Sequence, residues 1–205
     1  MAEPNVLRSG VDRELMWTPW EEAGLEHLRL VASDEGAVAN GLVMGLEADR
    51  PFRIGYEVRC DGHWRVREVR AAAPDLERPV LELLADGEGH WKRGGGEPIP
   101  ELDGCIDVDI SATPFTNTLP IRRLGLEPGE VANVNVAYIR VPELLVRAER
   151  QRYGCLQEQP DGGLYRFEAL PSGFTAELPV DADGLVIDYP GLFRRRGRVR
   201  DRVVR

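Results

Sequence analysis

The sequence predicts an all-β protein in which neighbouring strands are antiparallel. Apolar and polar residues alternate in short runs along most of the 205 residues, and turn sequences such as Asp-Gly separate several of these runs. Helical periodicity is limited to one short segment that follows Thr113. We therefore expect roughly eleven strands and one or two short helical turns.

Two strands are expected near the N-terminus. His27–Val31 alternates between apolar and polar positions, and Val38–Leu46 follows the turn sequence Ser33–Gly36. Trp17 and Trp20 precede both runs. We expect these two rings to close one end of the core rather than to bind a ligand.

The next two strands are expected to form a hairpin at Asp61-Gly62, a strong two-residue turn sequence. One face of the first strand carries an unbroken apolar row made of Phe52, Ile54, Tyr56, Val58 and Cys60. The returning strand is His63–Ala72.

The register of this hairpin raises a difficulty. A two-residue loop pairs Val58 with Arg65 and Tyr56 with Arg67, so two arginines share the apolar face. A three-residue loop pairs Val58 with Val66 but places other charged residues on that face. Because a buried unpaired charge costs several kcal/mol, we infer that this sheet lines a partly hydrated concavity. The alternative is that the charges reach solvent at a sheet edge.

Short strands are expected at Pro79–Ala85, at His90–Arg93 and at Ile106–Ile110. In the last of these, Asp107 and Asp109 project from one face of the strand, about 7 Å apart. This strand is the start of the stretch around which the chain is organised.

An uncharged polar turn follows this strand and leads into the helical segment. Its polar members and its one aromatic ring are Thr113, Phe115, Thr116, Asn117 and Thr118, and it ends at Arg122 and Arg123. Hydroxyl and amide groups beside an aromatic ring suit a hydroxyl-rich ligand. The alternative is a capped turn with Pro114 as the first helical residue, followed by a solvated pair of arginines.

The C-terminal part predicts two long strands, Val131–Val141 and Leu144–Leu156, and a final hairpin. A two-residue turn at Asp183-Gly184 would pair Val180 with Ile187.

The length and charge of the chain limit how many domains it can form and which partners it can bind. A chain of 205 residues fits one domain with its own core. We expect an N-terminal extension over residues 1–16, a single domain over 17–194, and a basic disordered tail over 195–205.

The net charge is −9, yet the last twelve residues hold seven Arg and one Asp. The acidic body should repel nucleic acid, so no nucleic-acid partner is expected, whereas the tail leaves peripheral membrane contact open.

The N-terminus carries no basic segment followed by an apolar run, and no apolar stretch reaches 18 residues. We therefore expect a cytoplasmic protein without a transmembrane segment.

The three cysteines, Cys60, Cys105 and Cys155, form no close pair and support neither disulfides nor a zinc site. The three histidines are scattered, and no phosphate-binding glycine motif is present, so no metal or cofactor is expected.

Catalysis has weak support in the sequence. None of the four serines lies in a GxSxG motif, and no catalytic residue is assigned. One alternative is that the chain is a hydrolase of a glycosylated or acylated ligand. Asp107 or Asp109 would then act as its acid or base. Glycosidases, however, place their two carboxyl groups on opposite sides of the bond they cleave, whereas neighbours on one strand face project side by side. The chain is thus more readily interpreted as a binding protein than as an enzyme.

A binding role for an amphipathic, glycolipid-like small molecule needs an apolar trough, an aromatic platform and a polar mouth. The candidate residues are Tyr56, Trp64, Arg65, Arg67, Asp107, Asp109, Phe115, Thr116, Asn117 and Arg122. In this hypothesis Arg65 and Arg67 neutralise an acidic head group. A third alternative is an interaction scaffold that uses the Arg-rich tail. The oligomeric state is not predicted.

The run DGCIDVDISATPFTNTLPIRRLGL resembles the bacterial family labelled "putative glycolipid-binding", formerly a domain of unknown function. YEVRCDGHWRVREV before it, and RQRY, SGFTAEL and DGLVIDYPGLFRR after it, extend the resemblance over about residues 17–194. The resemblance implies a single all-β domain whose long antiparallel sheet curls into a spiral β-roll or half-open barrel, similar to lipoprotein carriers that shield acyl chains. It carries no catalytic residues. Its motif positions here are Trp64, Arg65, Arg67, Asp107, Asp109, Phe115, Asn117 and Arg122.

Overall fold

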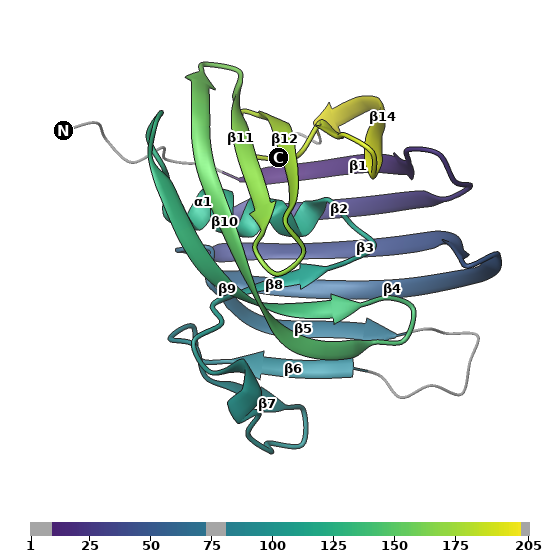
Figure 1. The fold of residues 1–205 in the computed structure, drawn as a ribbon, viewed down its shortest axis with the longest axis vertical. Helices are drawn as coiled ribbons and strands as arrows, with labels where there is room; N and C mark the ends of the chain where they lie inside the picture. The colour runs from purple at the N-terminus through teal and green to yellow at the C-terminus, as the bar shows by residue number, and fades with distance from the viewer. Residues whose placement is uncertain (1–9, 73–80, 202–205) are drawn as a thin grey trace.

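The structure, a computed structural model, describes residues 10–72 and 81–201 as two β-sheets with a short helical segment (Figure 1). The strand order in the nine-stranded sheet is β13-β14-β1-β2-β3-β4-β5-β6-β7, and in the five-stranded sheet it is β12-β11-β10-β9-β8. The large sheet is not closed into a barrel. The all-β, half-open architecture expected from the sequence is therefore confirmed.

The strands of the large sheet are β1 (Val11–Pro19), β2 (Leu25–Ser33), β3 (Gly36–Glu47), β4 (Arg50–Asp61), β5 (Val66–Ala72), β6 (Leu81–Ala85), β7 (Trp91–Arg93), β13 (Asp188–Tyr189) and β14 (Phe193–Asp201). Those of the small sheet are β8 (Asp107–Ile110), β9 (Val131–Arg140), β10 (Leu145–Gln159), β11 (Gly162–Ala169) and β12 (Phe174–Asp181). The helical elements are η1 (Pro100–Leu102), η2 (Phe115–Asn117) and α1 (Thr118–Leu124).

One pair of strands departs from the expected antiparallel arrangement. β8 and β9 are parallel, with Asp107 opposite Val136 and Ile110 opposite Ile139. Two parallel neighbours need a crossover connection, and the segment that holds η2 and α1 supplies it. The helical segment therefore lies against the sheets instead of extending one of them.

The large sheet extends across both of the expected domain boundaries. β1 begins at Val11, inside the predicted N-terminal extension, and residues 195–201 belong to β14 instead of a disordered tail. β14 pairs with β1, with Trp17 opposite Arg195. The Arg195 side chain explains the difference, because it donates to Asp181 Oδ2 at 2.6 Å and to the carbonyls of Leu185 and Val186. Residues 1–9, most of the predicted extension, and 202–205 lie outside the described residues.

The β4–β5 hairpin adopts neither of the two expected registers. Its loop has three residues, and Trp64 closes it with a left-handed φ of 62°, while the Asp61 N–H donates to the Arg65 carbonyl. A bulge then makes Arg67 an extra residue, so that Cys60 pairs with Val66 but Val58 pairs with Val69. The bulge turns Arg67 outward and keeps the valines inside, which avoids burying a guanidinium.

The last hairpin repeats this loop geometry. The Gly184 N–H donates to the Asp181 carbonyl at 2.8 Å, and Gly184 has a φ of 75°. The extra loop residue pairs Val180 with Val186 in place of the expected Ile187. Val186 is buried as a result, whereas Ile187 is 39% exposed.

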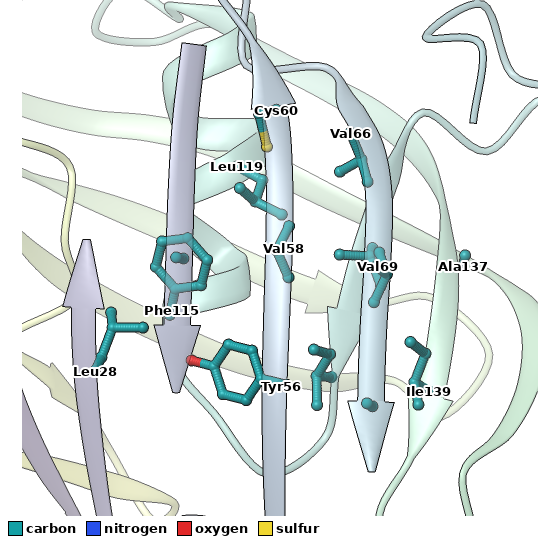
Figure 2. Packing of buried hydrophobic residues seen from close by; sticks show 14 of the residues in the cluster. Leu28, Tyr56, Val58, Cys60, Val66, Val69, Phe115, Leu119, Ala137 and Ile139 are labelled. Carbon is teal, nitrogen blue, oxygen red and sulfur yellow. The ribbon is translucent and has the colours of Figure 1, made fainter. Parts of the chain in front are cut away.

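The inner face of the large sheet is packed with side chains, which corrects the predicted hydrated concavity. Figure 2 shows Phe115 and Leu119, from η2 and α1, lying over β3 and β4 beside Val58. Phe115 is 1% exposed and Leu119 is fully buried, as is Ile54 in the apolar row of β4. The next apolar residue of α1, Ile121, packs in the core of the small sheet. The helical segment is thus wedged between the two sheets.

We expect Leu119→Ala to lower the free energy of unfolding by about 2–5 kcal/mol, because it leaves a cavity between the sheets. Urea denaturation measures this loss. Leu145→Ala is the matched control, since Leu145 is 64% exposed and its truncation should cost less than about 0.5 kcal/mol. Equal losses in the two variants would contradict the packing described for α1.

Candidate functional site

A cleft of about 300 Å³ opens at one end of the large sheet. Figure 1 shows the β1–β2 and β3–β4 connections at this end. The cleft is lined by the β1–β2 connection, by the end of β3 and by Phe52 of β4. Its remaining walls come from residues 111–112 after β8, from Val141 after β9, and from residues 191–193 at the start of β14. The cleft is therefore assembled from segments that lie far apart in the sequence.

Small residues on β3 explain why rings from β4 reach across the sheet. Gly41 faces inward opposite Tyr56, and a Cβ at Gly41 would lie 2.1 Å from the Tyr56 ring. Gly45 is opposite Phe52, whose ring would lie 3.1 Å from an added Cβ. In Figure 2 the Tyr56 ring extends from β4 over β3, with its hydroxyl on the side of β2.

This arrangement brings the Tyr56 hydroxyl to Glu26, a carboxyl group on the inner face of β2. Strand alternation places Glu26 between Trp17 of β1 and Val43 of β3. Glu26 is 2% exposed, and its Oε1 accepts a hydrogen bond from the Tyr56 hydroxyl at 2.5 Å. The Thr113 Oγ1 lies 3.2 Å from the same hydroxyl oxygen. The carboxyl group is thus held by residues from β4 and from the turn after β8.

The second oxygen of this carboxyl group has no hydrogen-bond partner within the described part of the chain. Burial raises the pKa of Glu26 from 4.5 to about 7, because removal from water disfavours the charged form. Tyr56, and after it Thr113, oppose this shift through hydrogen bonding. A buried carboxyl oxygen without a partner is costly, and Glu26 is among the residues that line the cleft.

Aromatic rings form the other walls of the cleft, and the two tryptophans are held in place by contacts. The Trp17 indole donates to the Val186 carbonyl at 3.0 Å and is fully buried. The Arg194 guanidinium lies 3.6 Å from the centroid of Trp20. Phe52 and Phe193 complete the set. The cleft therefore combines rigid aromatic faces with one buried polar atom that can accept or donate a hydrogen bond.

The structure places the carboxyl groups predicted as a polar mouth elsewhere. Asp107 is fully buried, and Arg123 donates to its two oxygens at 3.0 and 2.6 Å. Asp109 accepts from Thr116 Oγ1 at 3.1 Å and from Gln151 Nε2 at 2.6 Å. Burial raises the pKa of Asp109 to about 6. These bonds fasten the helical segment to the small sheet, and neither aspartate lines the cleft.

The other residues predicted near the helix also have partners in the packing. The Asn117 Oδ1 accepts from the Tyr153 hydroxyl at 2.9 Å, and Phe115 belongs to the core of the large sheet. Arg122 lies over the Trp64 ring, 5.5 Å from its centroid. Burial lowers the pKa of Arg122. These residues stabilise the contact between the sheets.

The two predicted head-group arginines lie on the outside. Arg65 pairs with Glu88, and Arg67 donates to the Asp86 carbonyl and lies 3.8 Å from the Asp61 carboxylate. Of all the predicted site residues, only Tyr56 contacts the cleft region, through its bond to Glu26. None of the others is brought to the same cavity.

The sequence did not lead us to name Glu26 as a candidate site residue. It also gave Trp20 no expected role in ligand binding. A signal was present, because strand alternation puts Glu26 on the same face as Leu28 and Leu30, where an acidic residue interrupts an apolar row.

A second hollow, of about 500 Å³, lies over the outer face of β2 to β5. Gly55 contributes to it, since nothing lies within 4 Å of the position that its Cβ would take. Its charged residues already have partners, Arg29 with Asp12 and Arg70 with Glu82. Without a buried unpartnered group, this hollow is the weaker candidate.

No group of three or more His, Cys, Asp or Glu side chains in the described ranges could hold a metal ion. Within the same ranges, no helix has the length and apolar character needed to span a membrane.

Comparison with known proteins identifies relatives of the chain. A family model described as "Putative glycolipid-binding" matches residues 14–195. A crystal structure of a DUF1089 family protein from Pseudomonas aeruginosa is similar, with 42% sequence identity and a TM-score of 0.73. The similarity covers 84% of this chain and 92% of that protein. No curated protein matches the chain.

We expect Glu26→Gln to change how stability depends on pH. The native state holds the Glu26 proton more tightly than the unfolded chain, so this contribution to stability is complete below pH 4.5 and is lost as the pH rises to about 7. Between pH 4.5 and 8 the loss is about 3 kcal/mol. Urea unfolding at both pH values should show this loss in the wild type and not in Glu26→Gln.

Glu35→Gln controls for the change in charge, because Glu35 is exposed in the β2–β3 turn. Asp109 titrates in the same direction, but it contributes equally to the wild type and both variants. Equal pH dependence in the wild type and Glu26→Gln would show that the Glu26 carboxyl is not buried as described.

Gly41→Ala should disrupt the contact between Tyr56 and Glu26, because the added methyl group overlaps the Tyr56 ring. We expect a loss of about 1–3 kcal/mol in the free energy of unfolding, measured in urea. Gly55→Ala serves as the control, since a methyl group there meets open space. A Gly41→Ala variant as stable as Gly55→Ala would contradict the position of the Tyr56 ring.

Proposed function

Because the chain belongs to the family described as "Putative glycolipid-binding", we propose that it binds a glycolipid-like amphipathic small molecule in the cleft around Glu26. In this proposal the protein holds the molecule without catalysing a reaction on it.

The observation that carries the proposal is the combination of aromatic walls with a buried, unpartnered carboxyl oxygen. Trp17, Trp20, Phe52 and Phe193 offer flat apolar faces, against which the apolar face of a sugar ring can pack. The Glu26 Oε2 offers a hydrogen bond to one hydroxyl group of that ring. Ligand sites typically combine an apolar lining with a few such polar groups.

The size of the cleft limits what it can enclose. A volume of about 300 Å³ lies at the lower end of the range for small-molecule pockets. Such a cleft takes one sugar ring or a short part of an acyl chain. The exposed side chains of Met44 and Leu192 at its rim would contact the rest of the molecule.

The alternative functions gain no support from the structure. A hydrolase that uses Asp107 or Asp109 would need a carboxyl group free to meet a substrate, yet Asp107 is held by Arg123 and Asp109 by Thr116 and Gln151. A scaffold that uses the Arg-rich tail would need free guanidinium groups, whereas those of Arg194 and Arg195 have contacts within the chain.

Titration with n-octyl β-D-glucoside below its micellar concentration tests the proposal. We expect a saturable change in intrinsic fluorescence, because Trp17 and Trp20 line the cleft. Ala112→Phe, which fills the cleft, should weaken binding at least tenfold.

Leu42→Ala is the control for the outer hollow and should leave the affinity unchanged. Absence of a saturable change in the wild type would contradict the proposed function. Binding that survives Ala112→Phe and is lost in Leu42→Ala would place the ligand in the outer hollow instead.

A further inference from the structure

The charged side chains that line the cleft are of one sign. Its lining includes four glutamates, Glu21, Glu22, Glu26 and Glu47, and no arginine or lysine. Two arginines adjoin lining residues, and both are engaged. Arg140 pairs with Glu47 and Glu143, and the Arg194 guanidinium covers the Trp20 ring. The lining itself therefore presents carboxylates and no cation to an anionic head group.

The buried end of the cleft adds a second requirement. Glu26 Oε1 is occupied by the Tyr56 hydroxyl, whereas Oε2 has no partner in the described structure. A hydroxyl group can donate to Oε2 when Glu26 is charged and can accept from it when Glu26 is protonated. An ionised carboxylate or phosphate oxygen can do only the second, and an ammonium group only the first. Of these groups, only a hydroxyl group matches both forms of Glu26.

We infer that Glu26 Oε2 is the point at which the cleft recognises the head group, and that it selects an uncharged, hydroxyl-bearing head group over an anionic one. This inference rests on the proposed binding in the cleft. It reverses the expectation, drawn from Arg65 and Arg67, that the ligand carries an acidic head group, because both arginines lie outside the cleft.

The inference also explains why several residues converge on Glu26. Trp17 and Val43 flank it in the sheet, and neither can satisfy Oε2 with a hydrogen bond. Thr113 already accepts the Phe115 N–H at 3.0 Å and lies beside the Tyr56 hydroxyl. The protein therefore fixes one oxygen of the carboxyl group and leaves the other for a partner that comes from outside.

Two amphiphiles with the same eight-carbon chain test the inference, n-octyl β-D-glucoside and n-octyl phosphate. We expect the wild type to bind the glucoside at least tenfold more tightly than the phosphate. Glu26→Leu removes the recognition point with little change in volume, and it should weaken glucoside binding at least tenfold. The same variant should bind the phosphate no more weakly than the wild type does. Glu35→Gln, distant from the cleft, should bind both ligands as the wild type does.

The outcomes separate this inference from the proposed function. If the wild type binds neither amphiphile, the proposed function fails, and the inference fails with it. If the phosphate binds as tightly as the glucoside, or if Glu26→Leu keeps full affinity for the glucoside, the inference is overturned while binding of an amphiphile stands. Should Glu26→Leu not fold, Glu26→Gln replaces it. Its amide keeps an acceptor for Tyr56 and always donates at the second position, to a hydroxyl or a phosphate oxygen alike. We expect it to narrow the preference for the glucoside over the phosphate, and an unchanged preference would equally overturn the inference.

Discussion

A carboxyl group buried inside a β-sheet is the constraint around which this end of the molecule is built. Removal of Glu26 from water is costly, and the protein compensates with the hydrogen bond from Tyr56 and a smaller contribution from Thr113. That bond depends in turn on Gly41, which leaves room for the Tyr56 ring to cross a neighbouring strand. A leucine at position 26 would fit the apolar row of β2 and would remove the cost. The presence of a carboxyl group is therefore better explained by a ligand than by folding.

The other acidic side chains between the sheets also lose contact with water, but there the protein supplies a partner for each oxygen. Asp107 is as deeply buried in the contact between the sheets and Asp109 is half-buried there, but each of their oxygens accepts a hydrogen bond, from Arg123, Thr116 or Gln151. These bonds hold the helical segment between the sheets and leave neither acid with an unpartnered oxygen. The difference between a structural acid and a candidate binding acid thus lies in the hydrogen bonds that remain unmade.

Much of the fold could be predicted from the sequence because the alternation of apolar residues determines which face of each strand is buried. The register of the hairpins could not, since a three-residue loop with a left-handed Trp64 or Gly184 follows the same Asp-Gly sequences as a two-residue turn. The predicted site residues are dispersed for a related reason. Without the bulge at Arg67, arginines are expected to face the apolar row, and a hydrated concavity is one way to accommodate them. The cleft itself is formed by residues of strands β1, β2, β3 and β4 together with residues 111–112 and 191–193. These segments come together only through the packing of the two sheets.

The most direct test of this account is a crystal structure of the protein with n-octyl β-D-glucoside. We predict that the sugar ring lies in the cleft between Trp20 and Phe52, with one hydroxyl group within hydrogen-bond distance of Glu26 Oε2. A glucoside bound only over the outer face of β2 to β5, with Glu26 Oε2 bonded to nothing but water, would contradict it.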